Sequence, residues 1–154
     1  MELQLKPTDL RIGNIVYYQT EEGLVPNIID WEDLKRCVEH PENFNNEYKG
    51  IPLNWPLRDS LGLVWEDFGD WAYWHGHIGE WGVFQLYNDG TGLFFQLNTT
   101  CSIKLEYFHQ LQNAIYFSTG DEFFPNKELL FEKLDPEKLK CADLSDPNIG
   151  ELPF

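Results

Sequence analysis

Two histidines separated by one residue, His75 and His77, are the clearest candidates for chemistry in this chain. On a β-strand, residues two positions apart face the same side, so both imidazoles could reach one metal ion. Asp70 or Glu80 could add an oxygen ligand to the set that zinc requires. The alternative, which we favour, is two histidines on the surface of a sheet beside a glycine-rich turn. The sequence therefore predicts no cofactor and leaves a metal at His75 and His77 as a hypothesis.

Acidic residues and tryptophans crowd the segment just before this pair. Glu66, Asp67 and Asp70 lie close in sequence to Trp71 and Trp74. Paired carboxylates near aromatic rings occur in glycosidase clefts, and exposed tryptophans can bind sugars without catalysis. A polar turn between two buried strands explains the same residues, and we favour it because sequence spacing does not set the distance between carboxylates. These five residues form the candidate ligand-binding set.

A thiol and an imidazole, Cys101 and His109, could form a nucleophilic pair. No third residue marks an orienting group, and a buried structural cysteine is the commoner case. The chain contains no G-x-S-x-G, P-loop or G-x-G-x-x-G motif. The sequence therefore leans away from an enzyme, although it does not exclude one.

Three polar residues, His109, Gln112 and Asn113, lie on one side of a predicted helix. They could face solvent. They could instead bond to strand ends or to the turn around Arg11, which would join the two ends of the domain. We favour this structural network because buried amides need hydrogen-bond partners and then specify one arrangement.

The elements that position these residues are mostly strands. Asn88-Asp89-Gly90 supplies the positive φ of a hairpin loop. A helix is expected over Tyr107–Ser118 and ends at Gly120. Alternation and turn residues predict the strands of a central meander near Leu63–Phe68, Trp71–Ile78, Trp81–Tyr87, Leu93–Leu97 and Ser102–Leu105.

Short elements are predicted before the meander. Ile15–Tyr18 favours a strand, and Leu24–Ile29 favours an edge strand because Pro26 has no N–H to donate. Asp30 is expected to cap a helix over Trp31–Glu39. The buried stripe of that helix is predicted to be Trp31, Leu34 and Val38. A loop over Pro41–Gly50 and a short helix over Trp55–Leu61 are expected to follow.

A chain of 154 residues fits one domain. We expect residues 1–125 to form a single α+β domain. Its antiparallel, strongly twisted sheet, partly barrel-like at the N-terminal end, packs against the C-terminal helix. Residues 126–154 are expected to be an extension, with a short helix and then an irregular tail.

The charge of this chain restricts its partners. The net charge is −15, from 11 basic and 26 acidic residues, and no Lys or Arg occurs from Asp59 to Ile103. Direct binding to a nucleic-acid backbone or an acidic membrane is therefore disfavoured, whereas a basic protein partner would be attracted. Three cysteines without a C-x-x-C motif, and an N-terminus without an apolar signal region, predict a cytoplasmic protein with reduced thiols. The oligomeric state stays open.

Three motifs occur in a fixed order along the chain. They are DLRIGNIVY at Asp9–Tyr17, IPL at Ile51–Leu53 with the helix after it, and HQLQN at His109–Asn113 followed by TGDE at Thr119–Glu122. This pattern resembles a family of short proteins without an assigned activity from Bacteroidetes genomes, their prophages and their phages. The chain departs from the family pattern in the longer segment Trp31–Asn46 and in the longer tail past Pro125. The resemblance implies a small α+β domain, a bacterial cytoplasm and a mobile-element setting.

Together these features predict a non-enzymatic accessory or interaction protein of a mobile element or phage, which binds another protein through an acidic, aromatic surface. A narrower version is nucleic-acid mimicry, in which carboxylates imitate the spacing of phosphates. The alternative is a small-ligand, sugar or metal-binding module, or an enzyme, that uses the segment Trp65–Trp81.

Overall fold

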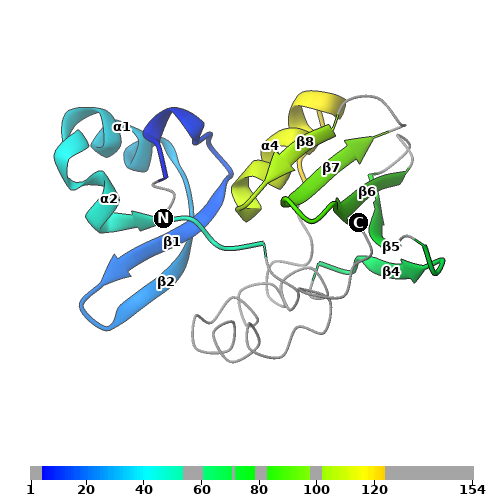
Figure 1. The fold of residues 1–154 in the computed structure, drawn as a ribbon. Coiled ribbons are helices and arrows are strands. Elements are labelled where there is room, and N and C mark those ends of the chain that lie inside the picture. The colour runs from blue at the N-terminus through cyan, green and yellow to red at the C-terminus, as the bar shows by residue number, and fades with distance from the viewer. Residues whose placement is uncertain (1–4, 54–60, 71, 79–82, 98–101, 124–154) are drawn as a thin grey trace.

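The structure is a computed structural model that describes residues 5–53, 61–70, 72–78, 83–97 and 102–123. These residues form two antiparallel sheets with helices, so the predicted α+β class is confirmed (Figure 1). The strand order is β2-β1-β3 in one sheet and β4-β5-β6-β7-β8 in the other. The described helices and strands are η1 (Pro7–Asp9), β1 (Ile15–Thr20), β2 (Gly23–Ile28), α1 (Trp31–Glu39), η2 (Pro41–Asn43), α2 (Phe44–Glu47), β3 (Tyr48–Lys49), β4 (Val64–Asp67), β5 (Ala72–His77), β6 (Val83–Asn88), β7 (Leu93–Leu97), β8 (Ser102–Leu105) and α4 (Phe108–Thr119).

The three-stranded sheet begins with a tight hairpin. Strands β1 and β2 pair from Ile15 opposite Ile28 to Thr20 opposite Gly23, and Gly23 takes the positive φ of 124° that the turn requires. Strand β2, which contains Pro26, lies at the edge of the sheet as predicted. The buried side chains of Ile15 and Val16 point to opposite sides of β1, so this strand supplies residues to two clusters.

Helix α1 begins and ends where the sequence predicted. The carboxylate of Asp30 accepts from the backbone N–H of Asp33 at 2.9 Å, and the carboxylate of Asp33 accepts from the N–H of Asp30 at 3.0 Å. The predicted buried stripe is right for Leu34, which packs against the smaller core cluster, but wrong for Trp31 and Val38, which are 65% and 79% exposed, and Cys37 is the buried residue. The apolar pattern did not identify the side of α1 that faces the sheet, because that side includes a polar residue, Asp33.

The segment predicted as a loop over Pro41–Gly50 instead forms η2, α2 and β3. Its buried rings, Phe44 and Tyr48, stack with centroids 5.6 Å apart. The Tyr48 hydroxyl donates to Asp33 at 2.7 Å, which ties β3 to α1. Burial raises the pKa of the Asp33 carboxyl, but this bond and the bonds from Asp30 and Asn27 outweigh burial and lower it. The smaller core cluster therefore contains Leu5, Val16, Ile29, Cys37, Phe44 and Tyr48.

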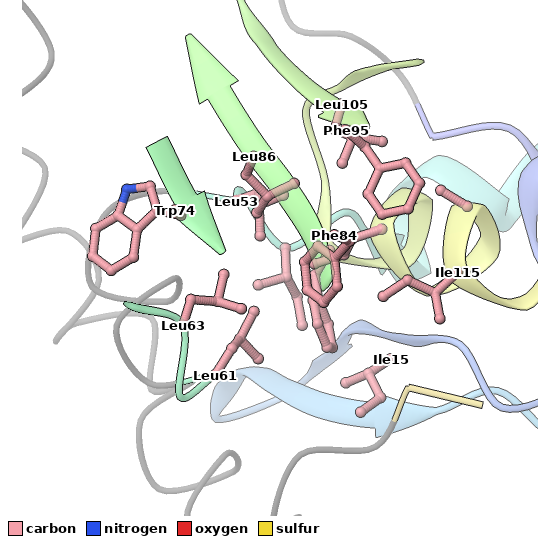
Figure 2. Packing of buried hydrophobic residues seen from close by; sticks show 14 of the residues in the cluster. Ile15, Leu53, Leu61, Leu63, Trp74, Phe84, Leu86, Phe95, Leu105 and Ile115 are labelled. Atoms are coloured by element: carbon pink, nitrogen blue, oxygen red, sulfur yellow. The ribbon is translucent and has the colours of Figure 1, made fainter. Parts of the chain in front are cut away.

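The five-stranded sheet is the predicted meander, with each strand within a few residues of its expected position. One face of the sheet is packed into the larger core cluster (Figure 2). Trp74, Phe84, Leu86 and Phe95 supply its buried side chains. Gly76 on β5 sits where a Cβ atom would lie 2.7 Å from Leu63 and from the Phe84 ring, so any side chain there would force these neighbours to move.

Helix α4 covers the same inner face. Its residues Phe108, Leu111 and Ile115 are fully buried, and it contacts β1 as well as β7 and β8. The helix ends at Gly120, which has a φ of 78°. Ile15 of β1 packs in the same cluster, so α4 connects the two sheets (Figure 2).

Some predicted elements fall on residues that the structure does not describe. These are nearly all of the short helix over Trp55–Leu61 and the whole extension over residues 126–154. Among the described residues, no helix combines the length and the apolar character that crossing a membrane requires.

Candidate functional site

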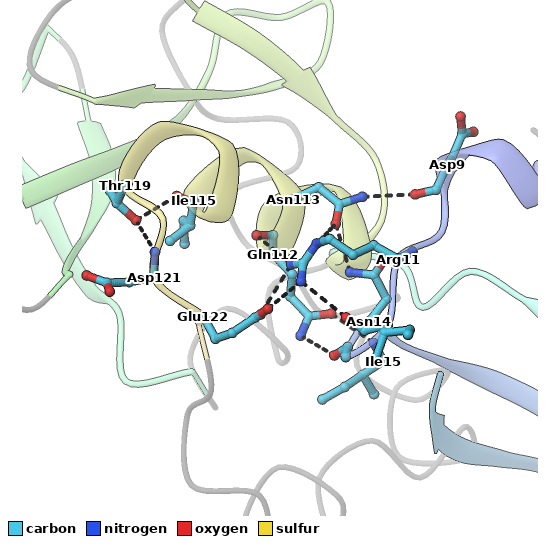
Figure 3. A network of polar contacts seen from close by, with 12 residues as sticks. Asp9, Arg11, Asn14, Ile15, Gln112, Asn113, Ile115, Thr119, Asp121 and Glu122 are labelled. Atoms are coloured by element: carbon cyan, nitrogen blue, oxygen red, sulfur yellow. Dashed lines mark hydrogen bonds and ion pairs between the residues drawn. The ribbon is translucent and has the colours of Figure 1, made fainter. Parts of the chain in front are cut away.

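A cluster of polar side chains joins the loop before β1 to α4 and the residues after it (Figure 3). Arg11 is central. Its guanidinium forms an ion pair with Glu122, including a 3.2 Å bond from Nη2 to Oε2, and its Nε donates to Asn113 at 3.1 Å. The guanidinium also lies 4.1 Å from the centre of the Tyr116 ring. Arg11 is therefore held by a carboxylate, an amide and an aromatic face at once.

The amides of this cluster are paired, and two of the three are buried. Asn14 Nδ2 donates to Asn113 Oδ1 at 2.9 Å. Gln112 Oε1 accepts from the backbone N–H of Ile15 at 2.8 Å, and Gln112 Nε2 donates to the carbonyl of Gly13 at 3.2 Å. Asn14 and Gln112 are completely shielded from solvent. Since an unpaired buried amide costs about 1–3 kcal/mol, these bonds fix how α4 sits against β1. We call this cluster the junction network.

His109 lies outside the junction network, although the sequence grouped it with Gln112 and Asn113. The side chain is buried and stacks on Tyr107 with centroids 5.8 Å apart. Neither ring nitrogen has a hydrogen-bond partner among the described residues. Burial lowers the pKa of His109 to about 4, although the negative charge of Asp9 acts to raise this pKa. His109 was misassigned because a helical wheel gives the direction of a side chain but not what covers it.

The second site candidate is the outer face of the five-stranded sheet, the face opposite the core. Alternation along the strands brings several aromatic and polar side chains to it. On the outer face, β6 carries Tyr87, which stacks on Phe94 of β7 at 5.7 Å. The outer-face residues from β4 to β8 are Val64, Glu66, Tyr73, His75, His77, Val83, Gln85, Tyr87, Phe94, Gln96, Ser102 and Lys104.

A row of rings runs along one half of this face. Phe68 stacks on Tyr73 at 5.7 Å, Tyr73 lies 6.0 Å from His75, and His75 lies 6.2 Å from His77. We call these four residues the aromatic row. Beside the row, His75 Nε2 and Glu66 Oε1 are 2.9 Å apart, so the imidazole and the carboxylate are hydrogen-bonded. The aromatic row therefore lies beside a carboxylate, that of Glu66, whose position is restricted by a hydrogen bond.

The structure shows only part of the geometry that a metal site at His75 and His77 requires. His75 and His77 do face the same side of β5, as the spacing predicted. However, Glu66 already occupies Nε2 of His75. No group of three or more histidine, cysteine or acidic side chains is placed to hold a metal among the residues that the structure describes. Glu80, one suggested ligand, lies outside the described residues.

The candidate ligand-binding set is divided between different places. Glu66 lies on the outer face, whereas the Asp67 carboxylate accepts from the backbone N–H of Gly69 at 2.8 Å in the turn after β4. Asp70 is exposed in the same turn. Trp74 is only 2% exposed and belongs to the core, so it is wrong as an exposed sugar platform. Trp71 lies outside the described residues.

The chemistry available at the Glu66–His75 pair is limited. A carboxylate that holds an imidazole can support proton transfer when a nucleophile bonds the other ring nitrogen. Nδ1 of His75 is buried and has no hydrogen-bond partner within the described part of the chain. The predicted thiol partner Cys101 lies outside that part. Within the described residues, the pair therefore orients Glu66 and has no nucleophile bonded to the other ring nitrogen of His75.

Several contributors to these sites were missed among the sequence-based candidates, including Asn14 in the junction network and Phe68 in the aromatic row. Tyr73 belongs to the aromatic row, and alternation with His75 and His77 is the signal that could have found it. Glu122 belongs to the TGDE motif, but its pairing with Arg11 spans 111 positions of sequence and is set by the tertiary fold. Comparison with models of protein families, with curated proteins and with solved structures finds no match for this chain.

Proposed function

We propose that this protein is a non-enzymatic interaction protein, which binds another protein through the outer face of its five-stranded sheet. One observation carries the proposal. The inner face is packed by α4 and the core, whereas the outer face leaves Val64, Phe68 and Val83 between 38% and 53% exposed beside the aromatic row. Partly exposed aromatic and aliphatic side chains on one rigid face are typical of protein interfaces.

The charge supports a basic partner. The net charge is −15, and the absence of Lys and Arg from Asp59 to Ile103 leaves β4 to β7 without a basic side chain, whereas Lys104 lies on β8 at the far edge of this face. A DNA-binding protein is one basic partner of this kind, and nucleic-acid mimicry is then the narrower form of the proposal. We place the protein in the bacterial cytoplasm as an accessory protein of a mobile element. The free, buried thiol of Cys37 supports a reducing compartment.

The test compares two sets of surface substitutions in affinity capture from a bacterial lysate. Val64→Ser with Val83→Ser removes apolar area from the outer face. Trp31→Ser with Val38→Ser removes apolar area from α1, where both side chains are well exposed. Both double variants should keep the melting temperature of the parent protein, since the changed side chains are at the surface.

The expected result is one captured protein that the wild type and the α1 variant retain and the outer-face variant loses. Mimicry adds that competing DNA and high salt release this protein. Equal capture by all three proteins, or loss only with the α1 variant, would show that the outer face is not the binding surface.

A further inference from the structure

We infer that the β4–β5 half of the outer face binds an arginine side chain of the partner, with the guanidinium stacked on the ring of Tyr73 and paired to the carboxylate of Glu66. This inference rests on the proposed function, because it specifies what the partner presents to the same face. Glu66 and Tyr73 are directly opposite each other in the antiparallel pair of β4 and β5. Opposite side chains have Cβ atoms about 4.5–5.5 Å apart, close enough for one guanidinium to contact both.

The molecule already holds an arginine in this way at the junction network. Arg11 lies over the Tyr116 ring at 4.1 Å and pairs with the carboxylate of Glu122. A tyrosine ring and a glutamate carboxylate are thus two of the groups that bind this guanidinium, beside the amide of Asn113. The outer face presents the same two groups, within a stretch of sequence that contains no arginine or lysine of its own.

Both groups are held in place before a partner arrives. The hydrogen bond from His75 at 2.9 Å restricts the Glu66 carboxylate, whose side chain is still 41% exposed. The Tyr73 ring is stacked on Phe68 at an interplanar angle of 24°. A restricted side chain loses less conformational entropy on binding, so the pair is suited to recognition by a flexible ligand.

The same geometry distinguishes arginine from lysine. A guanidinium is planar, stacks on an aromatic face and bonds a carboxylate with two parallel N–H groups. An ammonium group has the same charge but is a strongly hydrated point charge without a face to stack. A site made of a ring and a carboxylate should therefore prefer arginine, whereas a diffuse acidic surface should bind both equally.

The experiment measures binding of two fluorescein-labelled hexapeptides by anisotropy. One peptide alternates glycine and arginine, and the other alternates glycine and lysine. The expected result is that the arginine peptide binds at least about threefold more tightly, and that this preference persists when salt weakens both complexes. Equal affinity for the two peptides would overturn the inference, because charge alone would then explain the binding.

Variants locate the site. Glu66→Gln and Tyr73→Leu should each weaken the arginine peptide about two- to fivefold and bring its affinity close to that of the lysine peptide. Tyr73→Phe keeps the ring and should keep the preference. Glu22→Gln, in the exposed β1–β2 turn of the other sheet, removes the same charge and should change both affinities equally. Melting temperatures verify that each variant is folded.

Failure of this inference is distinguishable from failure of the proposed function. If Glu66→Gln and Tyr73→Leu leave the arginine preference unchanged while the outer-face double variant still loses the captured protein, the arginine site is wrong and the interface stands. If the capture experiment also fails to depend on the outer face, the proposed function is wrong as well.

Discussion

His109 is the residue whose protonation should affect the molecule most. The ring is buried at the start of α4, and neither nitrogen has a hydrogen-bond partner in the described structure. A buried imidazole of this kind stays neutral, since its charged form would lose hydration without gaining a partner. His109 therefore binds a proton less readily in the folded state than in the unfolded chain.

This residue gives a pH dependence with a definite sign. The pKa of His109 is about 4 in the folded state, against 6.5 for an unperturbed histidine, so the unfolded state binds the proton first as pH falls. The stability that neutral His109 provides is complete above pH 6.5 and is lost as pH falls toward 4. The expected loss is about 3 kcal/mol, measured by urea unfolding at several pH values.

His109→Phe is the informative variant, because a phenyl ring keeps the stack on Tyr107 and cannot be protonated. The variant should be at least as stable as the wild type at neutral pH and should lose less stability on acidification. A variant with the same pH dependence as the wild type would mean that other groups cause the acid sensitivity. A large loss at neutral pH would mean that the imidazole makes a needed hydrogen bond.

At the scale of elements, close packing on the inner face of β5 limits which side chains this strand tolerates. A Cβ atom at Gly76 would meet Leu63 and the ring of Phe84 at 2.7 Å, in the middle of the core. A Cβ atom at Gly92 would meet only the end of the Lys104 side chain, at 2.6 Å, which can swing into solvent. Gly76 lies on β5 and Gly92 in the loop between β6 and β7, and the two positions differ in whether the neighbouring side chain can move.

Gly76→Ala should therefore lower the free energy of unfolding by about 1–3 kcal/mol, the usual cost of overpacking a core. Gly92→Ala, the matched control, should change it by less than about 0.5 kcal/mol. Urea unfolding followed by tryptophan fluorescence measures both. Similar effects at the two sites would show that the packing around β5 is loose enough to accommodate a methyl group.

The elements also show what sequence can and cannot predict. Capping by Asp30 and Asp33, the Asp89-Gly90 turn and the alternating strands are local patterns, and each placed its element correctly. The buried side of α1 was wrong for Trp31 and Val38 because Asp33 faces inward to meet Tyr48, a partner 15 residues away. Such pairings depend on the tertiary fold and leave no trace in local periodicity.

The same limit applies to the candidate sites. Placement of His75 and His77 on one face follows from alternation alone. The burial of Trp74 and the pairing of Glu66 with His75 follow from which face of the sheet α4 covers. Residues that are neighbours in sequence could therefore be assigned to the core, a turn or the outer face only when the buried face of the sheet was known.

At the scale of the whole molecule, two structural features link the two sheets. The junction network connects residues near the N-terminus to α4 across about 100 positions of sequence. Strand β1 also belongs to both core clusters, since Ile15 packs in the larger one and Val16 in the smaller one. A change in either cluster must therefore strain a strand that the other cluster uses, and the two sheets should unfold together.

Val16→Ala tests this cooperativity. Val16 is fully buried in the smaller cluster, so truncation should cost about 2 kcal/mol and lower the melting temperature by several degrees. Four of the six tryptophans lie between Trp65 and Trp81, far in sequence from Val16. If the two sheets unfold together, tryptophan fluorescence should nevertheless report the full decrease in melting temperature. Val25→Ala, at a 41% exposed position on β2, is the matched control and should have little effect. If circular dichroism of Val16→Ala shows an early transition that fluorescence does not follow, the two sheets are independent units and β1 does not transmit stability between them.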